Sequence, residues 1–144
     1  MPESVGDSGA HLQALLFCEA VNEDSGPLKR PILVAVITHA FLPVGTTELP
    51  NLVAYVLLWN LSGRCELRLE WYAPDGEGLE FIPATVEQGD PRRAQEIIVD
   101  IPGLPIRGSG RYEMRAVLDG RFVGRAPMVV ELRPGMAIRP RSSN

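Results

Sequence analysis

Two histidines and one serine are the first side chains whose types suggest catalysis or metal binding. Neither His11 nor His39 has a second ligand at the spacing of a metal site. His39 lies in an apolar run, where a structural histidine with one satisfied hydrogen bond is favoured over a buried base. Ser109 lies between two glycines but lacks the Gly-x-Ser-x-Gly frame of a nucleophile turn. We therefore expect it to be a turn residue and not a nucleophile.

The carboxylates offer two further clusters. The spacing of Glu66 and Glu70 places both on the outward face of one strand, as an acid–base pair or a calcium site would require. Arg68 lies between them on the same face, which favours a solvated charge ladder instead. The acidic cluster from Asp75 to Glu80 does not have the spacing of a calcium loop. We therefore expect no catalytic residue, no cofactor and no metal site, and a chain that is not an enzyme.

The 144-residue chain is 45% apolar and long enough to bury a core without disulfides or a metal. Cys18 and Cys65 lie in apolar runs, which favours two small buried residues over a redox pair or a nucleophile.

Residues 1–10 are small, polar and acidic, which predicts a flexible leader without an export signal and a cytoplasmic protein with reduced thiols. No apolar run reaches the roughly eighteen residues of a membrane span, and the net charge of −4 argues against nucleic-acid binding.

Short apolar runs separated by Gly, Pro, Asn and Asp predict an all-β fold. About eight strands are expected: Leu12–Val21, Ile32–Leu42, Leu52–Trp59, Cys65–Tyr72, Leu79–Ile82, Ile97–Ile101, Tyr112–Leu118 and Phe122–Leu132. The first run also has a helical spacing, but the rest of the chain offers few helices for it to pack against. Eight short strands bury their inner faces best as a two-sheet antiparallel β-sandwich, here over residues 11–133, with residues 134–144 as a flexible tail.

Two of these segments and two of the turns between them have distinctive patterns. Ile32–Leu42 is apolar almost throughout, as expected of a central strand buried on both faces or lying next to an interface. In Cys65–Tyr72, alternate apolar residues predict a half-buried strand whose core side carries Cys65, Leu67, Leu69 and Trp71. Asp75-Gly76 and Asp119-Gly120 supply the positive-φ positions of hairpin turns.

The segment Gly108–Met114 resembles the tyrosine corner of immunoglobulin-like sandwiches, in which a Tyr two residues after a Gly anchors its strand through the hydroxyl. Met114 stands where antibody domains carry their second cysteine, so the inter-sheet disulfide is not expected. The stretches Leu12–Ala20, Leu67–Gly76 and Gly110–Gly120 are similar to a family of uncharacterised bacterial proteins. This resemblance implies a bacterial, immunoglobulin-like β-sandwich and brings no catalytic residue with it.

The charges are distributed unevenly along the chain. Residues 1–90 carry thirteen acidic and four basic side chains, whereas residues 91–144 carry five acidic and ten basic ones, all arginine. Arginine binds carboxylates and phosphates through a planar fork, so a basic docking face is one interpretation. The other is that early acidic and late basic strands lie side by side and neutralise each other.

The last hairpin, Arg111–Leu132, is the strongest candidate for a contact surface. Its strand faces mix arginine with aliphatic residues, which interface centres tolerate better than a solvent face does. The candidate contact residues are Arg111, Arg115, Val117, Val123, Arg125 and Val129. We expect a non-catalytic interaction module whose partner is another protein or a second copy.

Two alternatives stay open. A small-ligand site or an enzyme would gather residues from loops: Asp75 and Glu77 from one, Asp90 and Arg92 from another. A strand edge without proline or inward charge would instead accept a peptide by β-augmentation.

Overall fold

A computed structural model describes residues 9–23, 31–88 and 90–135 of the chain. It is all-β over these residues, as expected, but with ten strands instead of eight. They are β1 (His11–Cys18), β2 (Ala20–Glu23), β3 (Pro31–Val34), β4 (His39–Pro43), β5 (Leu52–Trp59), β6 (Gly63–Tyr72), β7 (Gly78–Gln88), β8 (Gln95–Ile101), β9 (Gly110–Leu118) and β10 (Arg121–Arg133). The expected leader and tail lie outside the described residues, apart from positions 9, 10, 134 and 135.

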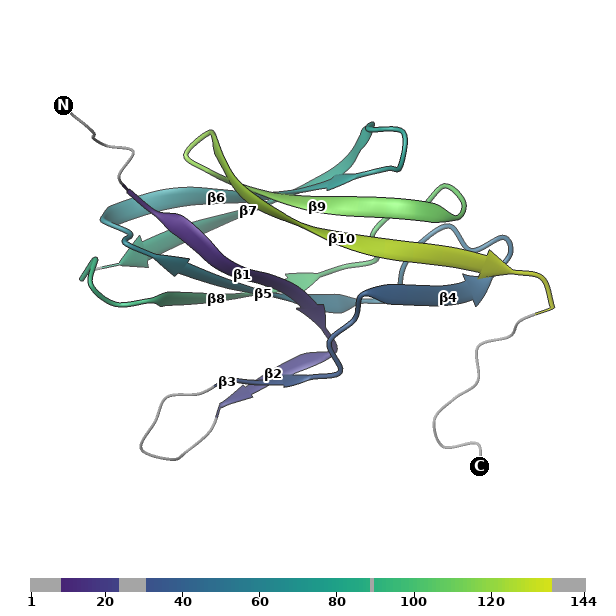
Figure 1. Cartoon of the computed structure of the whole chain (residues 1–144), viewed down its shortest axis with the longest axis horizontal. Coiled ribbons are helices and arrows are strands. Elements are labelled where there is room, and N and C mark those ends of the chain that lie inside the picture. Colours follow the sequence, from purple (N-terminus) through teal and green to yellow (C-terminus); the bar gives the residue numbers. More distant parts are fainter. Residues whose placement is uncertain (1–8, 24–30, 89, 136–144) are drawn as a thin grey trace.

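The strands form three sheets, of which two share the hydrophobic core. Their orders are β1-β5-β8, β4-β10-β9-β6-β7 and β2-β3. Figure 1 shows the three-stranded sheet facing the five-stranded one, with the β2–β3 hairpin projecting away from both. Trp71 of β6 joins the two layers, because its ring stacks on Tyr112 of β9 and meets the edge of Phe17 from β1.

The half-buried strand and the tyrosine corner are confirmed. Cys65, Leu67, Leu69 and Trp71 of β6 are all buried. Tyr112 is buried as well, and its hydroxyl is hydrogen-bonded to the backbone of residues 107 and 108. The β9–β10 hairpin turns as expected, with φ of 50° at Asp119 and 81° at Gly120.

Two long apolar runs do not form the strands expected of them. Leu12–Val21 divides at Glu19 into β1 and β2. Ile32–Leu42 divides into β3 and β4 around Ala35, whose φ is 56°. Within the described residues β3 pairs only with β2, and β4 lies at a sheet edge, where it pairs in parallel with β10. The expectation of a central strand buried on both faces is therefore wrong, and the five-stranded sheet is mixed instead of antiparallel.

Candidate functional site: an arginine-lined groove between two sheet edges

The outer face of the β9–β10 hairpin carries most of the expected contact residues. Arg111 lies opposite Val129, and Arg115 lies opposite Arg125, in the antiparallel register of the two strands. Because directly opposed residues share a sheet face, these four side chains lie on one surface. Val117 belongs to the same face of β9, but it is buried.

Val123 does not share this face. The register shifts between Phe122 and Gly124, so a bulge carries the side chain of Val123 towards the core, where it packs. Phe122 takes the position opposite Val117, and its side chain is 53% exposed. The sequence pattern assumed unbroken alternation and missed this bulge.

The arginines of this face differ in the hydrogen bonds and ion pairs that they make within the protein. Arg115 donates to Glu113 through Nε at 2.5 Å, and its guanidinium lies 4.0 Å from the ring centre of Tyr72. The hydrogen bond with Glu113 raises the pKa of Arg115. Arg125 reaches the same carboxylate only at 3.9 Å, and Arg111 has no hydrogen bond or ion pair with any described residue. Within the described residues, Arg111 and Arg125 are therefore held less firmly by the protein than Arg115 is.

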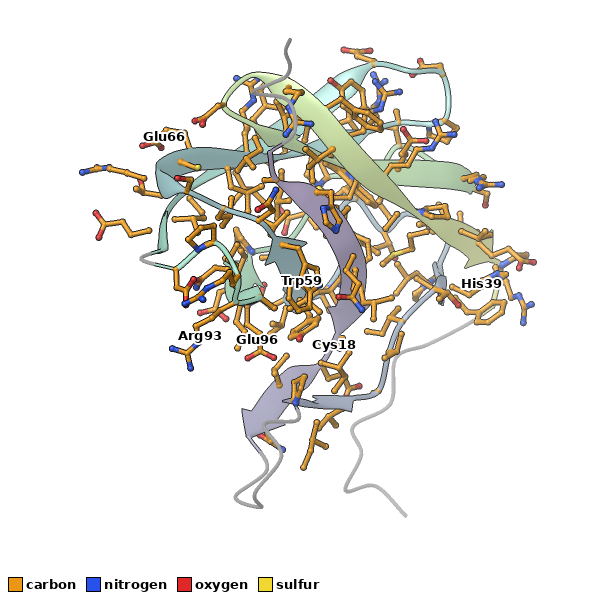
Figure 2. The ribbon with its side chains drawn as sticks, turned by 60° about the vertical axis from the view of Figure 1, so that its left-hand side comes forward. Cys18, His39, Trp59, Glu66, Arg93 and Glu96 are labelled. Carbon is orange, nitrogen blue, oxygen red and sulfur yellow. The ribbon has the colours of Figure 1, made fainter. Side chains whose placement is uncertain are left out.

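Both of these arginines line a groove of about 450 Å³, which we call the seam groove, between β1 and β10. Its other lining residues are Leu15, Leu16, Phe17, Ile37, Thr38, His39, Ala126, Pro127 and Val129. Figure 2 shows the two strands diverging, β10 towards His39 and β1 towards Cys18. No carboxylate is among the lining residues, and the charged ones, Arg111 and Arg125, are cationic.

His39 lies at the end of this groove and is not the buried histidine that the sequence suggested. Its side chain is 40% exposed, and Nε2 lies 3.1 Å from Oε1 of Glu131. The imidazole stacks on Phe41, and the guanidinium of Arg133 lies 4.1 Å from the centre of the Phe41 ring. These contacts hold the rim of the groove in place around β4 and the end of β10.

The groove closes at both ends through contacts between distant parts of the chain. At one end β10 approaches β1 so closely that a Cβ on Gly124 would overlap Cδ2 of Leu12. At the other end the Ile37 N–H donates to the Phe17 carbonyl at 2.8 Å, and the Val129 N–H donates to the Thr38 carbonyl at 3.1 Å. The segment between β3 and β4 thus bridges the two strand edges.

The loop residues of the alternative site do not come together. Arg107 donates to Glu77 at 2.8 Å and lies 3.5 Å from Asp75, whereas Asp90 pairs with Arg92 at 3.1 Å. The two loops lie at opposite ends of the eleven-residue β7, which spans about 35 Å (Figure 1). One loop-built site therefore cannot use all four residues.

The remaining chemical candidates have structural partners. Ser109 Oγ accepts a hydrogen bond from the Leu132 N–H at 2.8 Å, consistent with a turn role. Glu66 is exposed, but Glu70 is only 6% exposed and receives Arg68 Nε at 2.6 Å and the Tyr72 hydroxyl at 2.7 Å. The expectation of a solvated charge ladder is therefore wrong for Glu70, a buried carboxylate that pairs with the half-exposed side chain of Arg68.

The charges of the two halves of the chain pair both within each half and between the halves. Arg68 binds Glu70 in the first half, and Arg115 binds Glu113 in the second. Arg107 with Glu77 joins the early and late parts. Mutual neutralisation of neighbouring strands therefore does not account for Arg111 and Arg125.

A wider hollow of about 780 Å³ lies over the outer face of β5 and β8. Figure 2 shows Trp59, Glu96 and Arg93 on this side of the molecule. Tyr55 donates to Glu96 at 2.6 Å, and burial together with this bond raises the pKa of the tyrosine. Arg92, Arg93 and Glu96 all line this hollow, so, unlike the seam groove, it includes a carboxylate among its lining residues.

The described residues carry neither a metal-binding cluster nor a membrane-spanning helix. No group of three or more His, Cys, Asp or Glu side chains there is arranged to hold a metal ion. Nor does the described part of the chain contain a helix long and apolar enough to cross a membrane.

Solved structures that are similar to this chain include two from Pseudomonas species. No family model matches the chain, and no curated protein matches its sequence. The alkylpurine DNA glycosylase AlkC of Pseudomonas fluorescens, bound to DNA with an abasic site analogue, is similar at 10% identity and a TM-score of 0.49. The match covers 85% of this chain but only 30% of the glycosylase. An immunoglobulin-like protein of Pseudomonas aeruginosa is similar at 10% identity and a TM-score of 0.39, with 85% and 96% of the two chains covered.

Proposed function

We propose that this chain is a non-catalytic protein-interaction module, built as an immunoglobulin-like sandwich, that binds its partner in the seam groove. The observation that carries the proposal is the lining of that groove. Arg111 and Arg125 reach it from the outer face of the last hairpin, and no carboxylate lines it. Binding sites tend to be concave and mainly apolar with a few polar groups that fix orientation, and this groove has that composition.

Arginine is also the charged residue that protein interfaces favour, because its fork binds carboxylates in two places and its stem packs on apolar surface. Val129, Pro127 and Ala126 supply that apolar surface between the two arginines. Of the contact residues expected from the sequence, Arg111, Arg125 and Val129 line this groove, which supports the proposal.

Selection of short displayed peptides against the immobilised full chain tests this proposal, with fluorescence polarisation measuring the affinity of those enriched. We expect R111E and R125E each to weaken binding by about tenfold or more. R92E makes the same charge change in the β7–β8 loop, which lines a different hollow, and should leave the affinity unchanged. Failure to enrich any peptide, or equal binding by R125E and the wild type, would overturn the proposal.

Light scattering during size exclusion tests for a second copy as the partner. A dimer that R125E dissociates and R92E leaves intact would identify the partner as another copy of this chain. A dimer insensitive to both variants would place self-association elsewhere and would contradict a groove-mediated dimer.

A further inference from the structure

We infer that the seam groove binds an extended acidic segment of another protein as an added β-strand along the free edge of β1. This inference rests on the proposed function and specifies how the partner binds and what it contains. It depends on three features of the groove. The backbone of β1 pairs with no described strand on the groove side, the facing edge of β10 contains a proline, and the charged lining residues are arginines.

The backbone of β1 is available on the side that faces the groove. β1 lies at the edge of its sheet and pairs with β5 on its other side. On the groove side, the Phe17 carbonyl accepts from Ile37, and the bridge between these two residues is isolated. The backbone groups of alternate strand residues point to the same side, so the N–H and carbonyl of Leu15 face the groove as well. Leu15 thus offers a partner strand one donor and one acceptor.

The chain itself shows that a stretch of backbone fits between the two edges. Ile37 is hydrogen-bonded to β1 and Thr38 to β10, so this segment already occupies one end of the seam. From the contact of Leu12 with Gly124 to Phe17, β1 advances five residues, or about 17 Å. A segment of about five extended residues therefore matches the open part of the seam.

The facing edge of β10 is a poorer template for a strand. Val129 donates towards Thr38, so Pro127, two residues earlier, presents its backbone on the groove side as well. Proline has no N–H, and at strand edges it blocks unwanted pairing. β1 contains no proline, so the added strand would pair with Leu15 and leave β10 to supply side chains.

The side chains around the groove define the partner. Successive residues of an added strand point to opposite faces of the sheet. Those on the outer face would meet Arg111 and Arg125, which favours Asp or Glu at alternate positions. Those on the inner face would meet Leu15, Phe17 and Ala126, which favours small apolar residues. The expected ligand is therefore a short run of alternating acidic and apolar residues.

Single N-methylation along a peptide enriched against the full chain tests the pairing directly. Each methyl group removes one backbone donor, and loss of a hydrogen bond weakens binding by up to about tenfold. We expect a loss at the one position whose N–H meets the Leu15 carbonyl and none at its two neighbours, and slower hydrogen exchange of the Leu15 amide when the peptide is bound. Enriched peptides should also carry acidic residues at every second position.

The outcomes separate this inference from the proposed function. Peptides that need Arg111 and Arg125 but tolerate every N-methylation, with an unchanged Leu15 amide, would overturn strand addition and leave the interaction module standing. Enrichment of basic or charge-free peptides would overturn the acidic partner. Loss of binding on N-methylation at one position but not at its two neighbours, together with protection of Leu15, would establish the inference.

Discussion

The hydroxyl of Tyr112 donates a hydrogen bond to the carbonyl oxygen of Gly108 at 2.8 Å. The hydroxyl oxygen of Tyr112 in turn accepts a hydrogen bond from the backbone N–H of Arg107 at 2.7 Å. The phenol is fully buried, so one side chain satisfies two backbone groups of the connection that leads into β9. This contact fixes the start of the strand that carries Arg111.

Replacing Tyr112 by Phe should therefore destabilise the fold without opening a cavity. The change removes the partner of the Arg107 N–H and of the Gly108 carbonyl, at a cost of about 0.5–1.5 kcal/mol for each hydrogen bond. Equilibrium unfolding in urea measures this loss. A free energy of unfolding within about 0.5 kcal/mol of the wild type would show that the corner contributes nothing to stability.

Loss of the Trp71 side chain should lower the free energy of unfolding more than loss of any other side chain. It is fully buried, stacks on Tyr112 at 5.3 Å, and donates from Nε1 to the Pro105 carbonyl at 2.8 Å. W71A should cost about 3–5 kcal/mol in urea unfolding. W71F keeps a ring and gives a measurable folded variant if W71A does not fold, and W59A, at a partly exposed position, should cost less. Equal losses for Trp71 and Trp59 would contradict this account of the core.

The two thiols should react only when the protein unfolds. Cys18 and Cys65 are buried and free. Burial raises the pKa of both, and the charge of Asp119 adds to the rise at Cys65, so less of the nucleophilic thiolate is present near neutral pH. Ellman's reagent should therefore label neither thiol in the native protein and both in concentrated urea, with C18A and C65A assigning the signals. Native labelling at the unfolded rate would show that one thiol is accessible.

Much of the core could be predicted from local pattern, but burial of the apolar runs could not. The alternation in β6 and the Asp119-Gly120 turn are properties of adjacent residues, and both are confirmed. The apolar run Ile32–Leu42 suggested a buried strand, yet Ile32 and Val36 are 49% and 48% exposed. Nothing in their residue types signals the turn of the chain at Ala35, which separates two edge strands.

For the candidate site, too, the sequence predicted what depends on adjacent residues and missed what depends on tertiary contacts. Spacing placed Arg111, Arg115 and Val117 on one face correctly, because β9 is regular over those residues. Val123 was misplaced by the bulge in β10. The groove itself was not predictable, because its walls come from β1 and β10, which are distant in sequence and meet only through tertiary contacts.

The contact of Glu131 with His39 should appear in the acid titration of the protein. The hydrogen bond with His39, with a further contribution from Arg133, lowers the pKa of Glu131 below its ordinary value. A lowered folded-state pKa means that this contact stabilises the fold above the unfolded pKa and that the stabilisation is lost as the pH falls through the folded value. Carboxyl NMR titration should show the Glu131 pKa rising towards the ordinary value in H39A. An unchanged Glu131 pKa in H39A would show that His39 does not contribute.

The close approach of Gly124 to Leu12 should make these two positions interdependent. An added methyl group at Gly124 would overlap the Leu12 side chain, so G124A should cost about 1–3 kcal/mol through overpacking. L12A makes room for that methyl group, and the double variant should therefore be more stable than the two single losses predict. A double-mutant cycle in urea measures the coupling, which should exceed about 0.5 kcal/mol. Strictly additive losses would mean that β10 moves away from β1 to accommodate the methyl group, and the closed end of the seam groove would then be adjustable.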